Sequence, residues 1–118
     1  MANSIQELIV LKNGKSIHGA LRTDPFTLRT EFGALKLRKR DILSIEYKNL
    51  PYMLQDEVQV SAGTRIGGEL LPAKIRIALD NTGQIIVIPK SDILAIVLFT
   101  GRSRPVSAAT RRLLRTIV

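Results

Sequence analysis

Residues 13–47 read NGKSIHGALRTDPFTLRTEFGALKLRKRDILSIEY, and residues 62–98 repeat the pattern as AGTRIGGELLPAKIRIALDNTGQIIVIPKSDILAIVL. The match begins at an offset of 49 residues and reaches 51 after two single-residue insertions, both at turns, where extra residues cost least. A repeated supersecondary unit that cannot close a core alone is the usual meaning of such a period. The aligned positions are Gly14 with Gly63, Ile17 with Ile66, Gly19 with Gly68, Leu21 with Leu70, Phe26 with Ile75, Leu28 with Ile77, Gly33 with Gly83, Leu35 with Ile85, Leu37 with Val87, and Asp41 with Asp92.

Each copy contains about five short runs in which apolar and polar residues alternate, which is typical of half-buried strands joined by tight turns. The glycine inside the second run of each copy, Gly19 or Gly68, indicates a bend or a close backbone approach. Gly83 closes the turn at 80–83 and is expected to have a positive φ. Residues 85–88 and 93–99 alternate less than their counterparts. The second copy is therefore expected to be more buried, facing a partner subunit.

Composition restricts the class of protein. The chain has 118 residues, enough for one compact domain or two very small ones. Its interior is expected to be aliphatic, because 45% of residues are hydrophobic and only 4% aromatic. No cysteine is present for disulfides or thiolate chemistry. The amino terminus lacks the pattern of a secretory signal, and no stretch reaches the ~20 apolar residues of a membrane span, so a cytoplasmic location is expected.

The formal charge of +8 is spread unevenly. Residues 1–50 hold nine Lys/Arg against five Asp/Glu, residues 51–98 hold four against five, and residues 99–118 hold five Arg and no acid. The two copies have therefore diverged in charge while keeping one apolar pattern. We divide the chain into a first repeat at 1–50, a second repeat at 51–100, and a basic linker with a C-terminal helix at 101–118.

The order of the first copy resembles the Sm-like family, and particularly its bacterial Hfq-like members. The resemblance rests on a first strand ending in a turn at 10–14, a glycine-containing second strand at 17–21, an aromatic third strand at 26–28, and a final strand after a basic turn at 41–45. It implies strongly bent five-stranded barrels that assemble into rings and bind single-stranded RNA. The expected fold is therefore all-β: two tandem pseudo-symmetric SH3/Sm-like small barrels packed together, with a short C-terminal amphipathic helix.

The family's basic RNA-binding stretch before the last strand corresponds to Arg38, Lys39 and Arg40, but the aromatic or histidine that accompanies it is missing. Lys36, Arg38 and Arg40 alternate along a strand, so they are expected on one face while Leu35 and Leu37 point inward. Such a row of cations could contact successive phosphates. It could equally be a solvated face, or an edge strand that its charges protect from aggregation.

The C-terminal segment combines a basic linker with an amphipathic pattern. Apolar residues over 106–118 follow helical spacing, and a helix of this length is marginal unless it docks. We prefer docking on a subunit with the arginines outward; binding to nucleic acid and binding to an anionic membrane are the alternatives. The candidate contacts are Arg102, Arg104, Arg111, Arg112 and Arg115.

Three other features have simple structural explanations. His18 is the only histidine, and without cysteines or clustered carboxylates it makes no metal site; we expect an exposed strand residue. Asp41 and Asp92 precede the final strands, where aspartate bonds to turn backbone. The GKS at 14–16 lacks the preceding glycine and the following helix of a phosphate-binding loop.

The sequence thus favours a non-enzymatic, oligomeric protein that binds nucleic acid, RNA rather than DNA, through a basic strand face and a basic tail. No catalytic residue, metal, cofactor or small-molecule substrate is expected. The alternative is a structural or protein-interaction module that assembles into rings or filaments without nucleic acid. In that alternative, the first repeat of one subunit meets the second repeat of the next.

Overall fold

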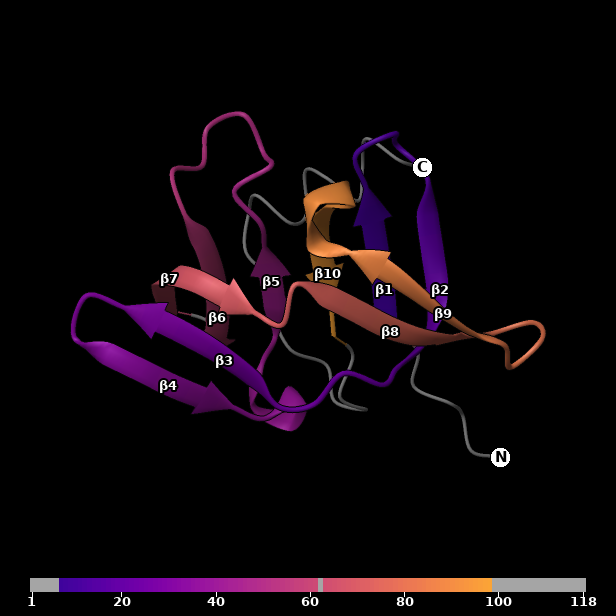
Figure 1. Ribbon diagram of the computed structural model, residues 1–118, viewed down its shortest axis with the longest axis horizontal. Helices are drawn as coiled ribbons and strands as arrows, with labels where there is room; N and C mark the ends of the chain where they lie inside the picture. The colour runs from indigo at the N-terminus through magenta and orange to yellow at the C-terminus, as the bar shows by residue number, and fades with distance from the viewer. Residues whose placement is uncertain (1–6, 62, 99–118) are drawn as a thin grey trace.

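The computed structural model describes residues 7–61 and 63–98, and this part of the chain is all-β (Figure 1). Two short 3-10 turns, η1 (Lys39–Asp41) and η2 (Lys90–Asp92), interrupt the strands at equivalent points of the two repeats. The strands are β1 (Glu7–Leu11), β2 (Ser16–Leu21), β3 (Phe26–Thr30), β4 (Gly33–Leu37), β5 (Ser44–Glu46), β6 (Asp56–Ser61), β7 (Thr64–Leu71), β8 (Lys74–Leu79), β9 (Ile85–Pro89) and β10 (Ile93–Val97). The C-terminal helix predicted within 101–118 lies outside the described residues.

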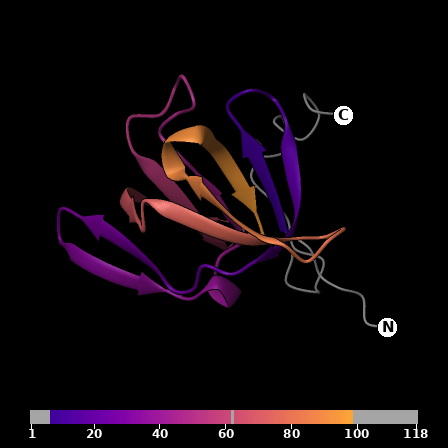
Figure 2. The same cartoon turned by 45° about the vertical axis from the view of Figure 1, so that its right-hand side comes forward.

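All ten strands form one curled antiparallel sheet in the order β4-β3-β7-β6-β5-β10-β1-β2-β8-β9. Reading this order from either end gives equivalent strands of the two repeats, so a pseudo-two-fold axis passes between β5 and β10. We call the five strands from β4 to β5 the β4 half, and the five from β10 to β9 the β9 half, after their edge strands. The β3–β4 and β8–β9 hairpins run across the front of the other strands, with their turns at opposite ends of the molecule (Figures 1 and 2).

The strand order does not follow the repeats. A simple meander would place β3 beside β2, but β3 pairs with β7 of the second repeat, and β8 of the second repeat pairs with β2. The chain crosses between the halves at 22–25 and again at 72–73, through cis peptide bonds at Asp24-Pro25 and Leu71-Pro72. Each half therefore contains two strands of one repeat and three of the other, whereas the expected tandem small barrels would each consist of one repeat.

The predicted glycine approach is confirmed in both copies. A Cβ on Gly19 would collide with the backbone carbonyl of Ala78, and a Cβ on Gly68 with the backbone carbonyl of Arg29. Both contacts are with the hairpin that the other repeat contributes. The absence of a side chain is thus what lets the exchanged hairpins lie against the second strand of each repeat.

The pairing of β8 with β9 changes the alignment of the two repeats after the hairpin turn. Leu28 pairs with Leu35 in the first hairpin, whereas its counterpart Ile77 pairs with Ile86. The predicted correspondence of Leu35 with Ile85, and likewise of Leu37 with Val87, is wrong by one residue, because both insertions fall in the 80–83 turn. Gly83 in that turn has φ of 75°, as expected.

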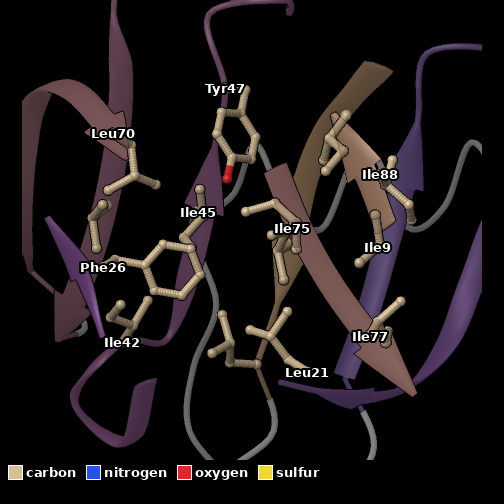
Figure 3. Packing of buried hydrophobic residues seen from close by; sticks show 14 of the residues in the cluster. Ile9, Leu21, Phe26, Ile42, Ile45, Tyr47, Leu70, Ile75, Ile77 and Ile88 are labelled. Carbon is tan, nitrogen blue, oxygen red and sulfur yellow. The ribbon is translucent and has the colours of Figure 1, made fainter. Parts of the chain in front are cut away.

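One continuous core joins the two halves, and it is largely aliphatic as predicted. Among the described residues, its only aromatic members are Phe26 and Tyr47, both almost completely buried. Figure 3 shows Ile45 and Tyr47 between side chains of the β4 half and side chains of the β9 half. The other buried members are Ile9, Leu21, Leu28, Ile42, Val58, Leu70, Ile75, Ile77, Ile88, Ile93, Ile96 and Leu98.

Candidate nucleic-acid interface

Strand β4 forms one free edge of the described sheet, and the predicted cations lie on it and directly after it: Lys36 is in β4, Arg38 follows its end, and Arg40 is in η1. We call β4 together with Arg38 and Arg40 the β4 edge. Lys36, Arg38 and Arg40 are all exposed. Lys36 lies opposite Thr27, whereas Leu37 lies opposite the buried Phe26, so the lysine is on the face away from the core. The predicted alternation is therefore present at Lys36 and Leu37. It ends with the strand at Leu37, so the expected row of three cations along one strand is not formed, because Arg40 lies in the 3-10 turn η1. Leu35 also faces inward, although 42% of its surface stays exposed.

These three cations have no ion-pair partner among the described residues, within 7–61 and 63–98. Other cations nearby do have partners. Arg29 lies 3.6 Å from Glu69, and Arg65 contacts both Glu46 and Glu57. The positive charge of the β4 edge therefore has no compensating carboxylate in the part of the chain that the structure describes.

Lys39 does not join this row. Its Nζ lies 3.3 Å from Glu7 Oε1 and donates a 2.9 Å hydrogen bond to the carbonyl oxygen of Leu21. Its backbone N–H donates to Asp24 Oδ1 at 2.9 Å. Only 30% of the Lys39 side chain is exposed, and its ammonium group forms an ion pair with the buried carboxylate of Glu7.

An equivalent lysine occurs in the second repeat. Lys90 Nζ lies 3.6 Å from Asp56 Oδ2 and donates to the carbonyl oxygen of Leu70 at 2.7 Å. The carboxylates of Glu7 and Asp56, both about 97% buried, accept the backbone N–H of Leu21 and Leu70 respectively. We call these two arrangements the lysine–carboxylate clamps, because each links η1 or η2 of one half to strands of the other half.

Sequence reasoning missed the clamps, although a signal was present. Glu7 and Asp56 are both acidic and are 49 residues apart, and Lys39 and Lys90 are 51 residues apart. These are the offsets of the repeat in its first and last parts. Recurring opposite charges within a repeat of otherwise apolar positions point to a structural pair.

A groove of about 960 Å³ opens beside the β3–β4 turn, and sequence reasoning missed it as well. Phe32 of the turn, Leu35 of β4, and Leu54 of the 47–55 loop line it, together with Lys48 and the β7 residues 65–69. Phe32 is 92% exposed and Leu54 is 97% exposed. Phe32 and Leu54 form one groove only because the turn and the loop lie close together in space, and the sequence does not reveal this proximity.

The other free edge, β9, is apolar. Ile85 and Val87 are 43% and 54% exposed, and residues 85–89 carry no charge. This strand is nevertheless more buried than its counterpart β4, because Ile88 is buried and Ile86 is partly buried, whereas β4 has no buried residue. The expected partner subunit stays a prediction.

Tyr47 is the one polar side chain of the shared core whose buried hydroxyl has no hydrogen-bond partner among the described residues. The hydroxyl points toward Ile45 and Ile75 (Figure 3). Burial raises the pKa of the Tyr47 hydroxyl well above its ordinary value, and the nearby Asp56 carboxylate adds to the rise. The phenol is therefore neutral at physiological pH.

The remaining predicted sites can be placed briefly. His18 is exposed on β2, as expected. Across the described ranges, no cluster of three or more His, Cys, Asp or Glu could hold a metal ion. The described residues also include no helix with the length and apolar character to cross a bilayer. The candidate contacts Arg102, Arg104, Arg111, Arg112 and Arg115 lie outside the described residues.

No protein-family model matches the chain, and neither the curated proteins nor the solved structures contain a match.

Proposed function

We propose that this protein is a non-enzymatic, Sm-like small-barrel protein that binds single-stranded nucleic acid, RNA in preference to DNA, along the β4 edge. The observation that carries the proposal is the set of three exposed cations at the β4 edge, Lys36 in the strand and Arg38 and Arg40 just after it, which have no acidic partner in the described part of the chain. Unpaired cations that lie close together in the sequence and are all exposed suit a polyanion, because phosphate contacts release condensed counterions. The basic tail supplies further contacts in this proposal.

Lys39 is left out of the proposed contact surface. Its ammonium group already neutralises Glu7, so turning it toward a phosphate would leave a buried carboxylate unpaired. The proposed site is therefore narrower than the basic stretch 38–40 of the sequence.

Filter binding of single-stranded RNA against salt concentration tests the proposal. The intact protein should bind with a Kd that rises steeply between about 50 and 200 mM salt. Alanine at Lys36, Arg38 and Arg40 together should weaken binding and flatten the log–log salt slope by about 2, since each lost contact with a single strand contributes roughly 0.7.

A matched control removes the same charge elsewhere. Lys12, Lys15 and Lys74 are exposed and have no ion-pair partner among the described residues. Alanine at these three positions should change the Kd much less than the β4 variant. Equal losses would mean that net charge alone, and not the β4 edge, governs binding. The same series with DNA of matching sequence tests the preference for RNA.

A second candidate function is assembly, and the exposed apolar β9 edge favours it. A strand edge with exposed Ile85 and Val87 and no charge is a template for pairing with another chain. In this proposal, β9 of one copy adds to β4 of the next, which continues the antiparallel sheet from copy to copy. Because β9 carries no charge, this pairing would place no like charge beside the cations of the β4 edge.

Light scattering tests assembly. Val87→Lys places a charge on the β9 edge and should lower the molar mass, and deletion of 102–118 should lower it too if the tail locks the contact. An intact protein that remains monomeric over the accessible concentrations would exclude this candidate.

A further inference from the structure

Exposed large hydrophobic side chains are not scattered over the described residues but fall in two places. Ile85 and Val87 lie on the β9 edge, discussed above. The other four, Phe32, Leu35, Tyr52 and Leu54, lie in the groove or on the loop that borders it. Apolar groups gathered in this way around a concavity mark a surface that contacts something.

The turn that carries Phe32 is held in place. The hydroxyl of Thr30 donates to the carbonyl oxygen of Gly33 at 2.9 Å and accepts the backbone N–H of Phe32 at 3.0 Å. The aromatic ring therefore projects from a turn that is tied on both sides. It presents an open face without requiring the backbone to reorganise on binding.

The opposite wall of the groove is shaped by Gly67 and Gln55. A Cβ on Gly67 would collide with the side-chain amide of Gln55, so the glycine allows the amide to lie across β7. Gln55 thus offers a donor and an acceptor beside the apolar lip formed by Leu54.

Most charges inside the groove are compensated, with the exception of the exposed Glu31, whereas the cations around it have no acidic partner among the described residues. Arg29 lies close to Glu69, and Arg65 contacts Glu46 and Glu57. Outside the groove, Lys36 in β4 and Arg38 just after the strand have no acidic partners in the described ranges, and Lys48 at the rim is likewise exposed. A ligand that fits this arrangement has a flat, uncharged part for the groove and an anionic part for its border.

We propose that the groove seats one base of a single-stranded nucleic acid, stacked on Phe32, while the adjoining phosphates lie over the β4 edge at Lys36 and Arg38. This inference rests on the proposed nucleic-acid binding and assigns a base site to it. Stacking on an exposed aromatic ring is tolerant of sequence, because every base has a π face. The amide of Gln55 supplies hydrogen bonds to a base edge.

The second hairpin lacks the same features. Its turn, 80–83, is Asp-Asn-Thr-Gly with no aromatic residue, and β9 carries no cation. The ring and the cations are thus both present on one hairpin and both missing from the other. The proposal therefore places one base site in each chain, in the β4 half.

The test uses the full chain and three substitutions at exposed positions. Phe32→Ala should weaken the Kd for a short oligoadenylate about 5- to 150-fold, the range measured when a stacking aromatic is truncated. An abasic ribose-phosphate oligomer of the same length should bind the parent and Phe32→Ala equally. Val87→Ala, an apolar truncation on the other exposed patch, is the matched control and should leave both Kd values unchanged.

Phe32→Trp adds a direct readout, because the chain has no other tryptophan. Its fluorescence should be quenched by oligoadenylate and not by the abasic oligomer. Unchanged oligoadenylate affinity in Phe32→Ala, together with loss of binding in the β4 triple variant, would overturn the base site and leave the proposed function standing. Absence of RNA binding by the parent would overturn both. A change in molar mass of Phe32→Ala with unchanged RNA affinity would overturn the base site in favour of a protein contact.

Discussion

Lys39 Nζ lies 3.3 Å from Glu7 Oε1, across the boundary between the two halves of the sheet. The lysine follows β4, whereas the glutamate begins β1, which belongs to the β9 half. Lys90 and Asp56 make the equivalent contact in the opposite direction. The two clamps therefore hold the halves together at both points where the chain crosses over.

Breaking one clamp should destabilise the protein strongly. Lys39→Ala is expected to lower the free energy of unfolding by about 3 kcal/mol, because it leaves the buried Glu7 carboxylate without its cation. Lys90→Ala should have a similar effect through Asp56. Urea unfolding followed by circular dichroism measures both. Lys36→Ala, at an exposed unpaired lysine, should stay within about 0.5 kcal/mol, and equal stability of Lys39→Ala and Lys36→Ala would contradict the clamp.

The close approach at the strand glycines gives a second prediction. Gly68→Ala should destabilise the protein by about 2 to 3 kcal/mol, since the new Cβ would meet the rigid backbone carbonyl of Arg29. Gly63→Ala is the matched control, because a Cβ there meets nothing within 4 Å. Thermal unfolding of the two variants should separate them clearly. A Gly68→Ala variant as stable as Gly63→Ala would show that β3 and β7 lie further apart.

Tyr47→Phe should stabilise the protein at neutral pH by about 1 kcal/mol. The substitution removes a buried hydroxyl that has no hydrogen-bond partner among the described residues, and it keeps the ring that packs between the halves. Chemical unfolding measures the difference. A clear loss of stability would mean that the hydroxyl makes a bond that compensates its burial.

The same tyrosine predicts a dependence on alkaline pH. Its pKa is raised in the folded protein, so the unfolded chain loses the phenolic proton first as the pH rises. The stability that Tyr47 contributes is complete below its unfolded pKa and falls above it, by about 1.4 kcal/mol per pH unit. Comparing the unfolding free energies of the parent and of Tyr47→Phe above about pH 10 isolates the contribution of Tyr47, because lysine titration is common to both proteins. Parallel pH profiles would contradict the burial of an ionisable phenol.

The exchange of hairpins predicts that neither repeat folds alone as a monomer. Within residues 1–50, β2 lacks β8 and β3 lacks β7, so both strands lose a pairing partner. Separate fragments 1–50 and 51–118 should show no cooperative unfolding as monomers, and mixing them should restore it in a 1:1 complex. Light scattering with circular dichroism checks both points. A folded monomer of 1–50 would refute the exchange, whereas a folded homodimer would agree with it.

The strands could be predicted from the sequence because their signals are local. Alternation and turn residues locate each strand within a residue or two, and the recurring Gly19 and Gly68 indicate the close approach. The exchange could not be predicted, because β3 and β8 present the same apolar pattern to either repeat. The alternation of apolar and polar residues shows which face of a strand is buried, but it does not show whether the strand pairs within its own repeat or with the other repeat.

The alignment error in β9 has a similar physical origin. Residues 85–88 are Ile-Ile-Val-Ile, so either set of alternate residues could face the core. Only the ladder to β8 decides that Ile86 and Ile88 point inward. In β4, by contrast, Lys36 between two leucines identifies the outer face directly.

The candidate site was predicted in part for a related reason. Lys36, Arg38 and Arg40 could be identified because they lie close together in the sequence, although only Lys36 lies in a strand. Phe32 and Leu54 come from separate loops, and their proximity depends on how the hairpin is placed against β7. Lys39 has the same charge as its neighbours, and only its position over Glu7 separates it from them.

The continuous ladder through β5 and β10 leaves the molecule with two ends of common origin but different character. In a dimer of identical single-repeat chains, every substitution would appear at both ends at once. Joining the copies in one polypeptide removes that constraint, so each end can acquire its own residues. The duplication has thereby produced a molecule whose two ends differ, positively charged at the β4 edge and apolar at the β9 edge. A single repeat that paired with a copy of itself could only build a symmetric molecule.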